Sequence, residues 1–388
     1  MKILLIHTYY HIRGGEDQVF EQEHELLMLK HEVRKLSFQN SSGFSGLLQF
    51  LKIRNNNHSN KRVEDTISEF QPDVIHIHNL HFAGGYGIIN IIQSYGIPIV
   101  MTLHNYRFLC PSGILFDGKE VYLSSLKSGF PWDAVFKGLY KKSVLFTFWL
   151  SYVTFCLNRN RTLDKIDKYI VLTDFAKNLY VDSKLNIDSS KFIVKPNFVK
   201  SIEVFNNENY TDCFLFVGRL SEEKGLDVLL EVITDSSFEF EIAGVGPLVE
   251  FVEKCVKDIP NRCVYHGRLS RLDILQRMKS CSMLILPSTC YEGMPMTIIE
   301  AFSVGLPVIA NNLGAMKSII EDGVNGFLYD GTKKGLLLAM DRLQKLDDRD
   351  KFVMRQNAYQ SYLDQYTANV NLERLEEIYS TLIHEKSN

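Results

Sequence analysis

The chain has 388 residues, of which 45% are hydrophobic, and its formal net charge is −3. A single domain typically has about 100 to 200 residues, and this chain is longer than that. Its length therefore predicts two domains. The small net charge, with no segment dominated by Lys and Arg, argues against a nucleic acid as partner. The seven cysteines include no Cys-x2-Cys pair. They favour a reducing cytoplasm and argue against structural zinc.

The first apolar run, residues 2–7, predicts a buried strand and is too short for a signal peptide, so we expect a cytoplasmic protein. Apolar runs bounded by turn residues then alternate with helical patterns, as in βα units that form parallel sheets. In the first half of the chain the predicted strands are residues 2–7, 32–37, 73–78, 98–103, 168–172 and 191–194.

The alternation lapses around residues 195–199 and in a polar stretch that ends with residues 206–209, where we place a domain boundary. The tail from 368 to 385 has helical spacing, with Leu372, Leu375 and Ile378 on one side. The second series of predicted strands comprises residues 213–217, 239–243, 262–265, 283–286, 307–310 and 326–329.

Residues 291–300 read Tyr-Glu-Gly-Met-Pro-Met-Thr-Ile-Ile-Glu, so Glu292 and Glu300 stand on either side of a Gly-x-Pro turn that opens onto an apolar helix. Pro295 suits the first helical position, and the free N–H groups of the next residues would point back to the loop. These groups and the helix dipole attract a phosphate. The two acids could then hold two ends of one ligand.

Other polar residues and glycines follow predicted strands, at the edge where open parallel sheets bind ligands. Gly14 and Gly15 would let the backbone approach a phosphate or sugar, although a glycine pair is more often only a tight turn. Arg219 and Lys224 could neutralise a diphosphate, and two solvated surface cations are an equally good interpretation. Residues 266–268, His-Gly-Arg, could pair with a base edge.

His104 follows the strand at 98–103 and could position a reacting sugar, whereas on its own it would be interpreted as a loop histidine. His76, His78 and His81 lie close together in sequence and suggest a metal. No carboxylate completes a familiar ligand set, so we interpret these three histidines as structural.

Together, the glycine pair 14–15, His104, the segment 218–225, Glu292 and Glu300 resemble the retaining glycosyltransferases of the GT-B fold, glycosyltransferase family 4. The resemblance covers nearly the whole chain in the expected order. It implies an α/β protein with two Rossmann-like, doubly wound parallel-sheet domains that face each other across a cleft. We expect an acceptor-binding domain at 1–197, a nucleotide-sugar-binding domain at 198–365, and a helix at 366–388 that packs back on the first domain.

The resemblance also implies roles for the matching residues. Glu292 would hydrogen-bond the hydroxyls of the donor sugar, and Glu300 would bind the ribose. Arg219 and Lys224 would bind the diphosphate and stabilise the leaving nucleotide, so that no metal or other cofactor is needed. His104 would contact the donor sugar near its reacting carbon. The implied donor-binding set also includes Gly14, Gly15, Gly267, Arg268, Gly293, Met294, Pro295 and Thr297.

The implied reaction moves a hexose or N-acetylhexosamine from a nucleotide diphosphate sugar, expected to be a UDP-sugar, to a glycan or polyprenyl-linked glycan, with retention by front-face attack. Residues 104–107 and 110–113 are similar to a subgroup of bacterial surface-polysaccharide enzymes. Phe198 stands where the family usually has glycine, which puts the hinge conformation in doubt. A nucleotide-sugar epimerase of similar fold and a non-catalytic sugar-nucleotide-binding subunit are the alternatives.

Residues 143–158 carry no charge and are bracketed by Lys141, Lys142, Arg159 and Arg161. They fall short of the roughly 20 apolar residues that a membrane-spanning helix needs. Such a helix could make peripheral contact with the anionic inner surface of the cytoplasmic membrane. A buried core helix is the other interpretation, which we favour. The sequence gives no indication of oligomeric state.

Overall fold

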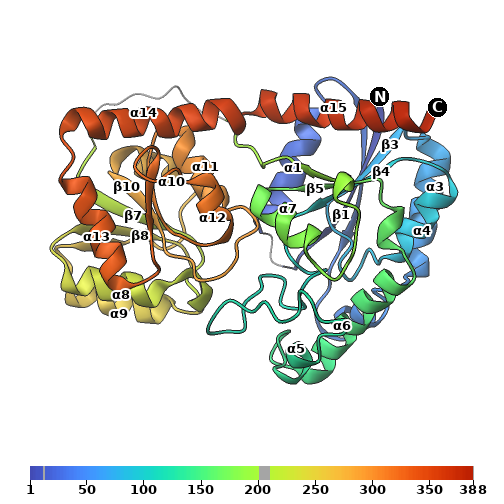
Figure 1. The fold of residues 1–388 in the computed structure, drawn as a ribbon, viewed down its shortest axis with the longest axis horizontal. Coiled ribbons are helices and arrows are strands. Elements are labelled where there is room, and N and C mark those ends of the chain that lie inside the picture. The colour runs from blue at the N-terminus through green and yellow to red at the C-terminus, as the bar shows by residue number, and fades with distance from the viewer. Residues whose placement is uncertain (12–13, 201–209, 388) are drawn as a thin grey trace. The chain divides into compact units, whose positions relative to one another are not determined.

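The computed structural model describes residues 1–11, 14–200 and 210–387, and Figure 1 shows it as a ribbon. The polar stretch at 206–209, on which the predicted boundary rests in part, lies outside the described residues. The chain divides into two compact units, and along the sequence the change from the first to the second falls between Asn197 and Phe198. The first unit comprises residues 1–115, 123–197 and 368 onward, and the second comprises residues 116–122 and 198–367.

The first unit is built on a six-stranded parallel sheet with the order β2-β1-β3-β4-β5-β6. The central strands β3 and β4 are buried along their whole length, as expected for parallel strands with both faces covered. Figure 1 shows α1 and α15 on one side of this sheet and α3 and α4 on the other. The strands are β1 (Lys2–Tyr9), β2 (Glu32–Gln39), β3 (Val74–Ile77), β4 (Ile99–Leu103), β5 (Lys168–Val171) and β6 (Phe192–Val194). The helices are α1 (Gly15–Leu27), α2 (Gly43–Leu51), α3 (Asn57–Phe70), α4 (Gly87–Ser94), α5 (Trp132–Phe136), α6 (Val144–Arg159), α7 (Asp174–Val181) and α15 (Ala368–Ser387).

The second unit holds another six-stranded parallel sheet, with the order β12-β11-β10-β7-β8-β9. Helices α8, α9 and α13 lie on one side of it, and α10, α11 and α14 lie on the other (Figure 1). The strands are β7 (Cys213–Val217), β8 (Glu239–Ala243), β9 (Cys263–Tyr265), β10 (Met283–Leu286), β11 (Val308–Asn311) and β12 (Gly326–Tyr329). The helices are α8 (Leu226–Asp235), α9 (Val249–Asp258), α10 (Arg271–Ser280), α11 (Met296–Ser303), α12 (Gly314–Ile319), α13 (Lys333–Gln344) and α14 (Asp348–Gln365).

The predicted fold class, two doubly wound parallel-sheet domains, is confirmed by these two sheets. All twelve predicted strands are present, each within two residues of its predicted bounds. The units differ from the predicted ranges in two short stretches, because residues 116–122 and 366–367 group with the second unit.

Phe198, which raised a doubt about the hinge, is fully buried, and its φ is not among the positive values that would favour glycine. Its neighbour Val199 is anchored to α14 and the residue that follows it. The Val199 N–H donates to the carbonyl of Tyr366, and Tyr362 Oη donates to the carbonyl of Val199, both at 3.0 Å. Hydrogen bonds and an apolar side chain therefore fix this segment without the freedom of a glycine.

Helix α6 is buried on one face only. Leu150, Val153 and Leu157 are buried, whereas Leu145 is 78% exposed and Phe148 is 38% exposed. The interpretation of α6 as a core helix therefore applies to one of its faces. Among the described residues, no helix is both long enough and apolar enough to cross a membrane.

Helix α15 packs on the first sheet through an apolar stripe that includes Leu375 and Ile378. Its one buried tyrosine, Tyr379, is bonded through Oη to Nδ1 of His76 at 2.6 Å. At the helix surface, Glu376 pairs with Lys30 Nζ at 3.1 Å and with His31 Nε2 at 2.9 Å. Both apolar burial and polar contacts thus attach α15 to the first unit.

Replacing Tyr379 with Phe should lower the free energy of unfolding by about 1 to 2 kcal/mol, because His76 loses a buried hydrogen-bond partner. Urea denaturation followed by circular dichroism measures this change. Ser380→Ala is a matched control, since Ser380 is exposed and its hydroxyl bonds to carbonyls of its own helix. Equal losses in the two variants would contradict the role given to Tyr379.

Candidate functional site

The strand order of each sheet reverses at one point, and open parallel sheets bind ligands beyond the carboxyl ends of the strands at that point. The reversal lies between β1 and β3 in the first sheet and between β7 and β10 in the second. Several predicted site residues follow these strands. Gly14 and Gly15 come after β1, Arg219 and Lys224 after β7, and Glu292 after β10.

Lys224 and Glu292 form an ion pair at the edge of the second sheet. Ser288 Oγ donates a hydrogen bond to the same Glu292 oxygen at 2.7 Å. Burial by itself would raise the pKa of Glu292, but the Lys224 ammonium and the Ser288 hydroxyl lower it, so the carboxylate is ionised at neutral pH. The predicted cation and the predicted sugar-binding acid are therefore direct partners, which sequence spacing did not indicate.

Gly225 allows the two loops that carry this pair to approach each other. Its φ is +65°, and a Cβ at this position would lie 2.1 Å from the carbonyl oxygen of Pro287. The Thr289 N–H also donates to the carbonyl of Glu223 at 2.9 Å, which joins the loops directly. A side chain at residue 225 would separate the loop after β7 from the loop after β10.

Helix α11 begins at Met296, one residue later than predicted. Pro295 is extended, with ψ of 111°, and is the N-cap rather than the first helical residue. Glu300 lies in the second turn, and burial raises its pKa. Its nearest cation is Arg271, with Nε 3.7 Å from Oε1, so Glu292 and Glu300 have different basic partners.

Sequence reasoning missed Arg271, the first residue of α10. Its Nε and Nη2 atoms are buried and have no hydrogen-bond partner among the described residues. Two unpaired N–H groups beside a carboxylate can bind a polar ligand. No motif pointed to this residue, because a single arginine at a helix start is common on protein surfaces.

The remaining donor-binding predictions fall on neighbouring loops of the second unit. Arg219 and Arg268 are exposed, on the loops after β7 and β9. Gly267 has φ of +65°, with open space where a Cβ would stand. Gly293 and Thr297 are partly buried beside α11, and Met294 is buried. All of these residues follow strands of the second sheet or adjoin α11.

His104 follows β4 in the first unit and is bonded to His78, which follows β3. His104 Nε2 lies 3.0 Å from His78 Nδ1. Burial holds the pKa of His104 well below its usual value, so the ring is neutral at physiological pH. His104 also lines a small pocket with Glu16 and Asn105.

Glu16, in the first turn of α1, is a second residue that sequence reasoning missed. Its Oε2 accepts hydrogen bonds from Tyr10 Oη at 3.1 Å and from Asn105 Nδ2 at 3.2 Å. Burial raises its pKa to about 7, even though the guanidinium of Arg107 opposes this shift. Gly14 supports the same turn, because its N–H donates to Asp17 Oδ2 at 2.9 Å.

A carboxylate does lie beside His76 and His78, contrary to the reason for interpreting these histidines as structural from the sequence. Glu23 of α1 reaches the sheet, and ligand atoms of Glu23, His76 and His78 lie within 4.8 Å of one another. The positive charge beside this carboxylate comes from Lys195, whose Nζ lies 2.6 Å from Glu23 Oε1. His81 lies apart from this group and bonds through Nδ1 to Tyr86 Oη at 3.2 Å.

A second group with metal-ligand atoms, Cys213, Glu241 and Cys281, lies in the second unit. His266 Nε2 lies 2.8 Å from one oxygen of Glu241, and Arg277 Nη1 lies 3.6 Å from the other. Cys213 is the first residue of β7, at the end opposite to the carboxyl edge. We assign this group no role in ligand binding.

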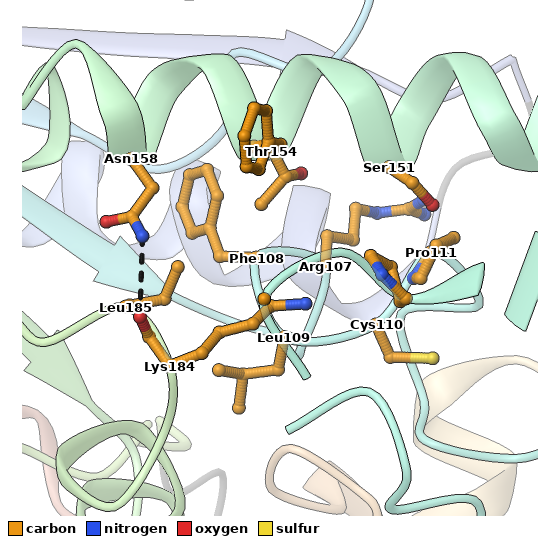
Figure 2. A pocket seen from close by; sticks show the side chains of 13 residues that line it. Arg107, Phe108, Leu109, Cys110, Pro111, Ser151, Thr154, Asn158, Lys184 and Leu185 are labelled. Atoms are coloured by element: carbon orange, nitrogen blue, oxygen red, sulfur yellow. Dashed lines mark hydrogen bonds between the residues drawn. The ribbon is translucent and has the colours of Figure 1, made fainter. Parts of the chain in front are cut away.

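Figure 2 shows a pocket of the first unit between residues 107–111 and α6. Apolar side chains such as Phe108 and Leu185 line it together with polar ones such as Asn158 and Lys184, a common composition for a small-ligand site. Asn158 Nδ2 donates to the carbonyl of Lys184 at 3.4 Å. Burial lowers the pKa of Lys184 to about 8, so most of the amine is still charged at pH 7.

Two family models match consecutive parts of the chain. The model described as Glycosyltransferase Family 4 matches residues 13–201, and the model described as Glycosyl transferases group 1 matches residues 199–361. Each model covers less than half of the chain, and together they span residues 13–361 and support a GT-B glycosyltransferase. The resemblance to GT-B glycosyltransferases thus extends over both units, whereas retention of configuration and a role in surface-polysaccharide synthesis stay predictions.

The names of proteins similar to this chain differ, and not all of them give a substrate. An uncharacterized glycosyltransferase of Methanocaldococcus jannaschii is 30% identical over 62% of this chain and 63% of its own length. The sulfoquinovosyl transferase of Arabidopsis thaliana is 28% identical over 69% of this chain and 49% of its own length. The lipopolysaccharide 1,6-galactosyltransferase of Salmonella typhimurium is 27% identical over 42% of this chain and 48% of its own length. The chain thus spans less than two thirds of each of these relatives.

Solved structures match the chain along nearly its whole length. Anabaena HepE in complex with UDP has a TM-score of 0.68 and 16% identity, over 98% of this chain and 100% of that one. Sucrose-phosphate synthase from Thermosynechococcus elongatus has a TM-score of 0.71 and 13% identity, over 99% of both chains. At these identities the likeness shows the fold, which is GT-B.

Replacing Glu16 with Gln should change how stability depends on pH. The folded-state pKa of about 7 exceeds the ordinary value of 4.5, so this proton stabilises the fold below pH 4.5 and its contribution is lost as the pH rises through 7. Between pH 5 and pH 8 the free energy of unfolding of the wild type should fall by about 2 kcal/mol more than that of Glu16→Gln. Urea denaturation at both pH values measures this difference.

The exposed Glu373→Gln change on α15 is the control, and its difference from the wild type should stay constant with pH. A pH-independent difference for Glu16→Gln as well would contradict the buried, protonatable state of Glu16.

Proposed function

We propose that the protein transfers a hexose or N-acetylhexosamine from a UDP-sugar to a glycan or polyprenyl-linked glycan, with retention of configuration and without a metal. The Lys224–Glu292 pair at the strand-order reversal of the second sheet carries this proposal, because it joins a cation for a diphosphate to an acceptor for sugar hydroxyls. The UDP complex of HepE and the name of the Salmonella relative support a UDP-sugar and a cell-surface glycan.

In this proposal, Lys224 and the exposed Arg219 bind the diphosphate together with the N–H groups at the start of α11. Once the diphosphate neutralises Lys224, the ionised Glu292 carboxylate can accept hydrogen bonds from the sugar. Its lowered pKa disfavours a role as general acid. Glu300 and Arg271 form the adjoining pair and would bind the ribose.

Lys224→Ala should reduce transfer by at least about 100-fold while the fold stays intact, because the leaving diphosphate loses a positioned cation. Release of UDP and appearance of glycosylated product, followed chromatographically, measure transfer. Glu292→Gln should cause a comparable loss. Lys333→Ala is the control, since Lys333 pairs with Asp235 at an exposed position and should leave transfer unchanged.

Near-normal transfer by Lys224→Ala or Glu292→Gln would overturn the assignment. Incubation with donor alone separates the transferase from an epimerase, which would interconvert the sugar without an acceptor. Donor binding with no turnover on a broad panel of acceptors would instead indicate a non-catalytic subunit. The anomeric configuration of the product, read by NMR, decides retention.

We also propose that helices α5 and α6 contact an anionic membrane surface, where a polyprenyl-linked acceptor would be found. Trp132 and Phe136 of α5 are 53% and 73% exposed, and Leu145 of α6 is 78% exposed. The Trp132 and Phe148 rings lie 6.1 Å apart, which places both helices in one apolar patch. The exposed lysines at 141–142 adjoin α6 and would meet acidic headgroups.

The wild type should float with phosphatidylglycerol vesicles in a density gradient, and a triple variant with Trp132, Phe136 and Leu145 changed to Ser should remain in the soluble fraction. Loss of apolar contact explains this outcome. Leu272→Ser, at a 64% exposed position of the second unit, is the matched control and should float like the wild type. Absence of the wild type from the floated fraction would refute the membrane contact.

A further inference from the structure

Four side chains form a continuous row in the first unit, from the core to His104. Lys195, after β6, places Nζ 2.6 Å from Glu23 Oε1, and the two side chains are 1% and 0% exposed. The other oxygen, Glu23 Oε2, lies 3.3 Å from Nε2 of His78, which is also fully buried. His78 Nδ1 in turn lies 3.0 Å from His104 Nε2.

The protonation of this row follows from its buried charges. Burial by itself would raise the pKa of Glu23, but the Lys195 ammonium and His78 outweigh it and hold this pKa well below its usual value. Glu23 is therefore an ionised carboxylate that only accepts hydrogen bonds. Glu23 Oε2 and His78 Nε2 are buried, form no hydrogen bond of normal geometry with any described residue, and have each other as close neighbours at 3.3 Å. A lone pair on His78 Nε2 would face a negative charge, so the His78 proton belongs on Nε2.

A neutral imidazole has one donor nitrogen and one acceptor nitrogen. If His78 is neutral with its proton on Nε2, its Nδ1 is an acceptor, and His104 Nε2 must then be the donor. Burial keeps the pKa of His104 well below its usual value, so this ring holds a single proton. His104 Nδ1 is left unprotonated and can accept a hydrogen bond from a hydroxyl.

The other titratable groups around the row are bonded elsewhere. His7 Nε2 lies 2.7 Å from Asp17 Oδ1. Both nitrogens of His76 meet hydroxyls, Tyr379 Oη at 2.6 Å and Thr102 Oγ1 at 2.7 Å. Burial lowers the pKa of His7 and of His76, so neither ring adds a positive charge. The Glu23 carboxylate thus remains the group that orients His78.

We propose that Glu23 and His78 are positioning residues that hold His104 in its Nε2–H tautomer, with Nδ1 free to accept a hydrogen bond from a substrate hydroxyl. Ordering of a histidine by a carboxylate through its second nitrogen is a general way to fix a tautomer. The substrate contact rests on the proposed transferase function, whereas the tautomer does not.

The tautomer is tested first, on the full chain labelled with 15N-histidine. Long-range 1H–15N correlation distinguishes the two ring nitrogens, and comparison with His104→Gln assigns the His104 signals. We expect a proton on Nε2 and an unprotonated Nδ1 at pH 7.5. A proton on His104 Nδ1 would overturn the proposal, because His78 would then be the donor.

The kinetic test compares His78→Gln with His78→Leu. A glutamine can donate to Glu23 with its NH2 group and accept from His104 with its carbonyl oxygen, as His78 does. We expect kcat to stay within about 5-fold of the wild type in His78→Gln and to fall roughly 10- to 100-fold in His78→Leu, with the donor KM nearly unchanged. Equal kcat values in the two variants would overturn the positioning role.

Thr102→Val is the control for general damage to this cluster, since it removes a buried hydrogen bond to His76 and leaves the row intact. It should lower the melting temperature without lowering kcat. If the wild type shows no transfer at all, the proposed function fails, and the tautomer measurement still decides the inference. The same measurement decides it if His78→Leu does not fold.

Discussion

The ion pair between Lys195 and Glu23 fixes the arrangement of the first unit. The two charged side chains are 1% and 0% exposed, so each needs the other as its partner. Removing one member of such a buried pair typically lowers the free energy of unfolding by about 3 to 5 kcal/mol. The pair connects the middle of α1 to the end of β6, residues 172 positions apart in sequence. It thereby sets how α1 lies on the sheet, and so places Glu16 at the carboxyl edge and Glu23 beside the histidines.

In the second unit, the site depends on the close approach of two backbone loops, those after β7 and β10, rather than on a buried charge. Gly225 leaves room for the carbonyl of Pro287, and the Thr289 N–H bonds to Glu223. Only because these loops touch can Lys224 and Glu292, 68 positions apart in sequence, form a pair. Spacing along the chain indicated both residues, but the contact between them follows from the pairing of β7 with β10.

The sequence was sufficient to predict the strands, because each is a short apolar run between turn residues and burial selects such runs. It was insufficient for polar residues on helices, since these normally face water and their burial depends on tertiary packing. Glu23 nevertheless carried a signal. It stands on one helical stripe with Val19, Phe20, Leu26 and Leu27, all of them buried. An acid in the middle of an apolar stripe predicts a buried partner, whereas nothing comparable marks Arg271.

The two ion pairs differ in exposure, and this difference separates a scaffold from a ligand site. The side chains of Lys224 and Glu292 are 22% and 16% exposed, so a diphosphate can reach Lys224 and replace the carboxylate as its partner. Glu23 and Lys195 have no such access, and an exchange of partners there would leave a buried charge unpaired. The accessible Lys224–Glu292 pair is therefore the one proposed to bind the donor. The buried Lys195–Glu23 pair instead orients His78, and His78 in turn sets the proposed tautomer of His104.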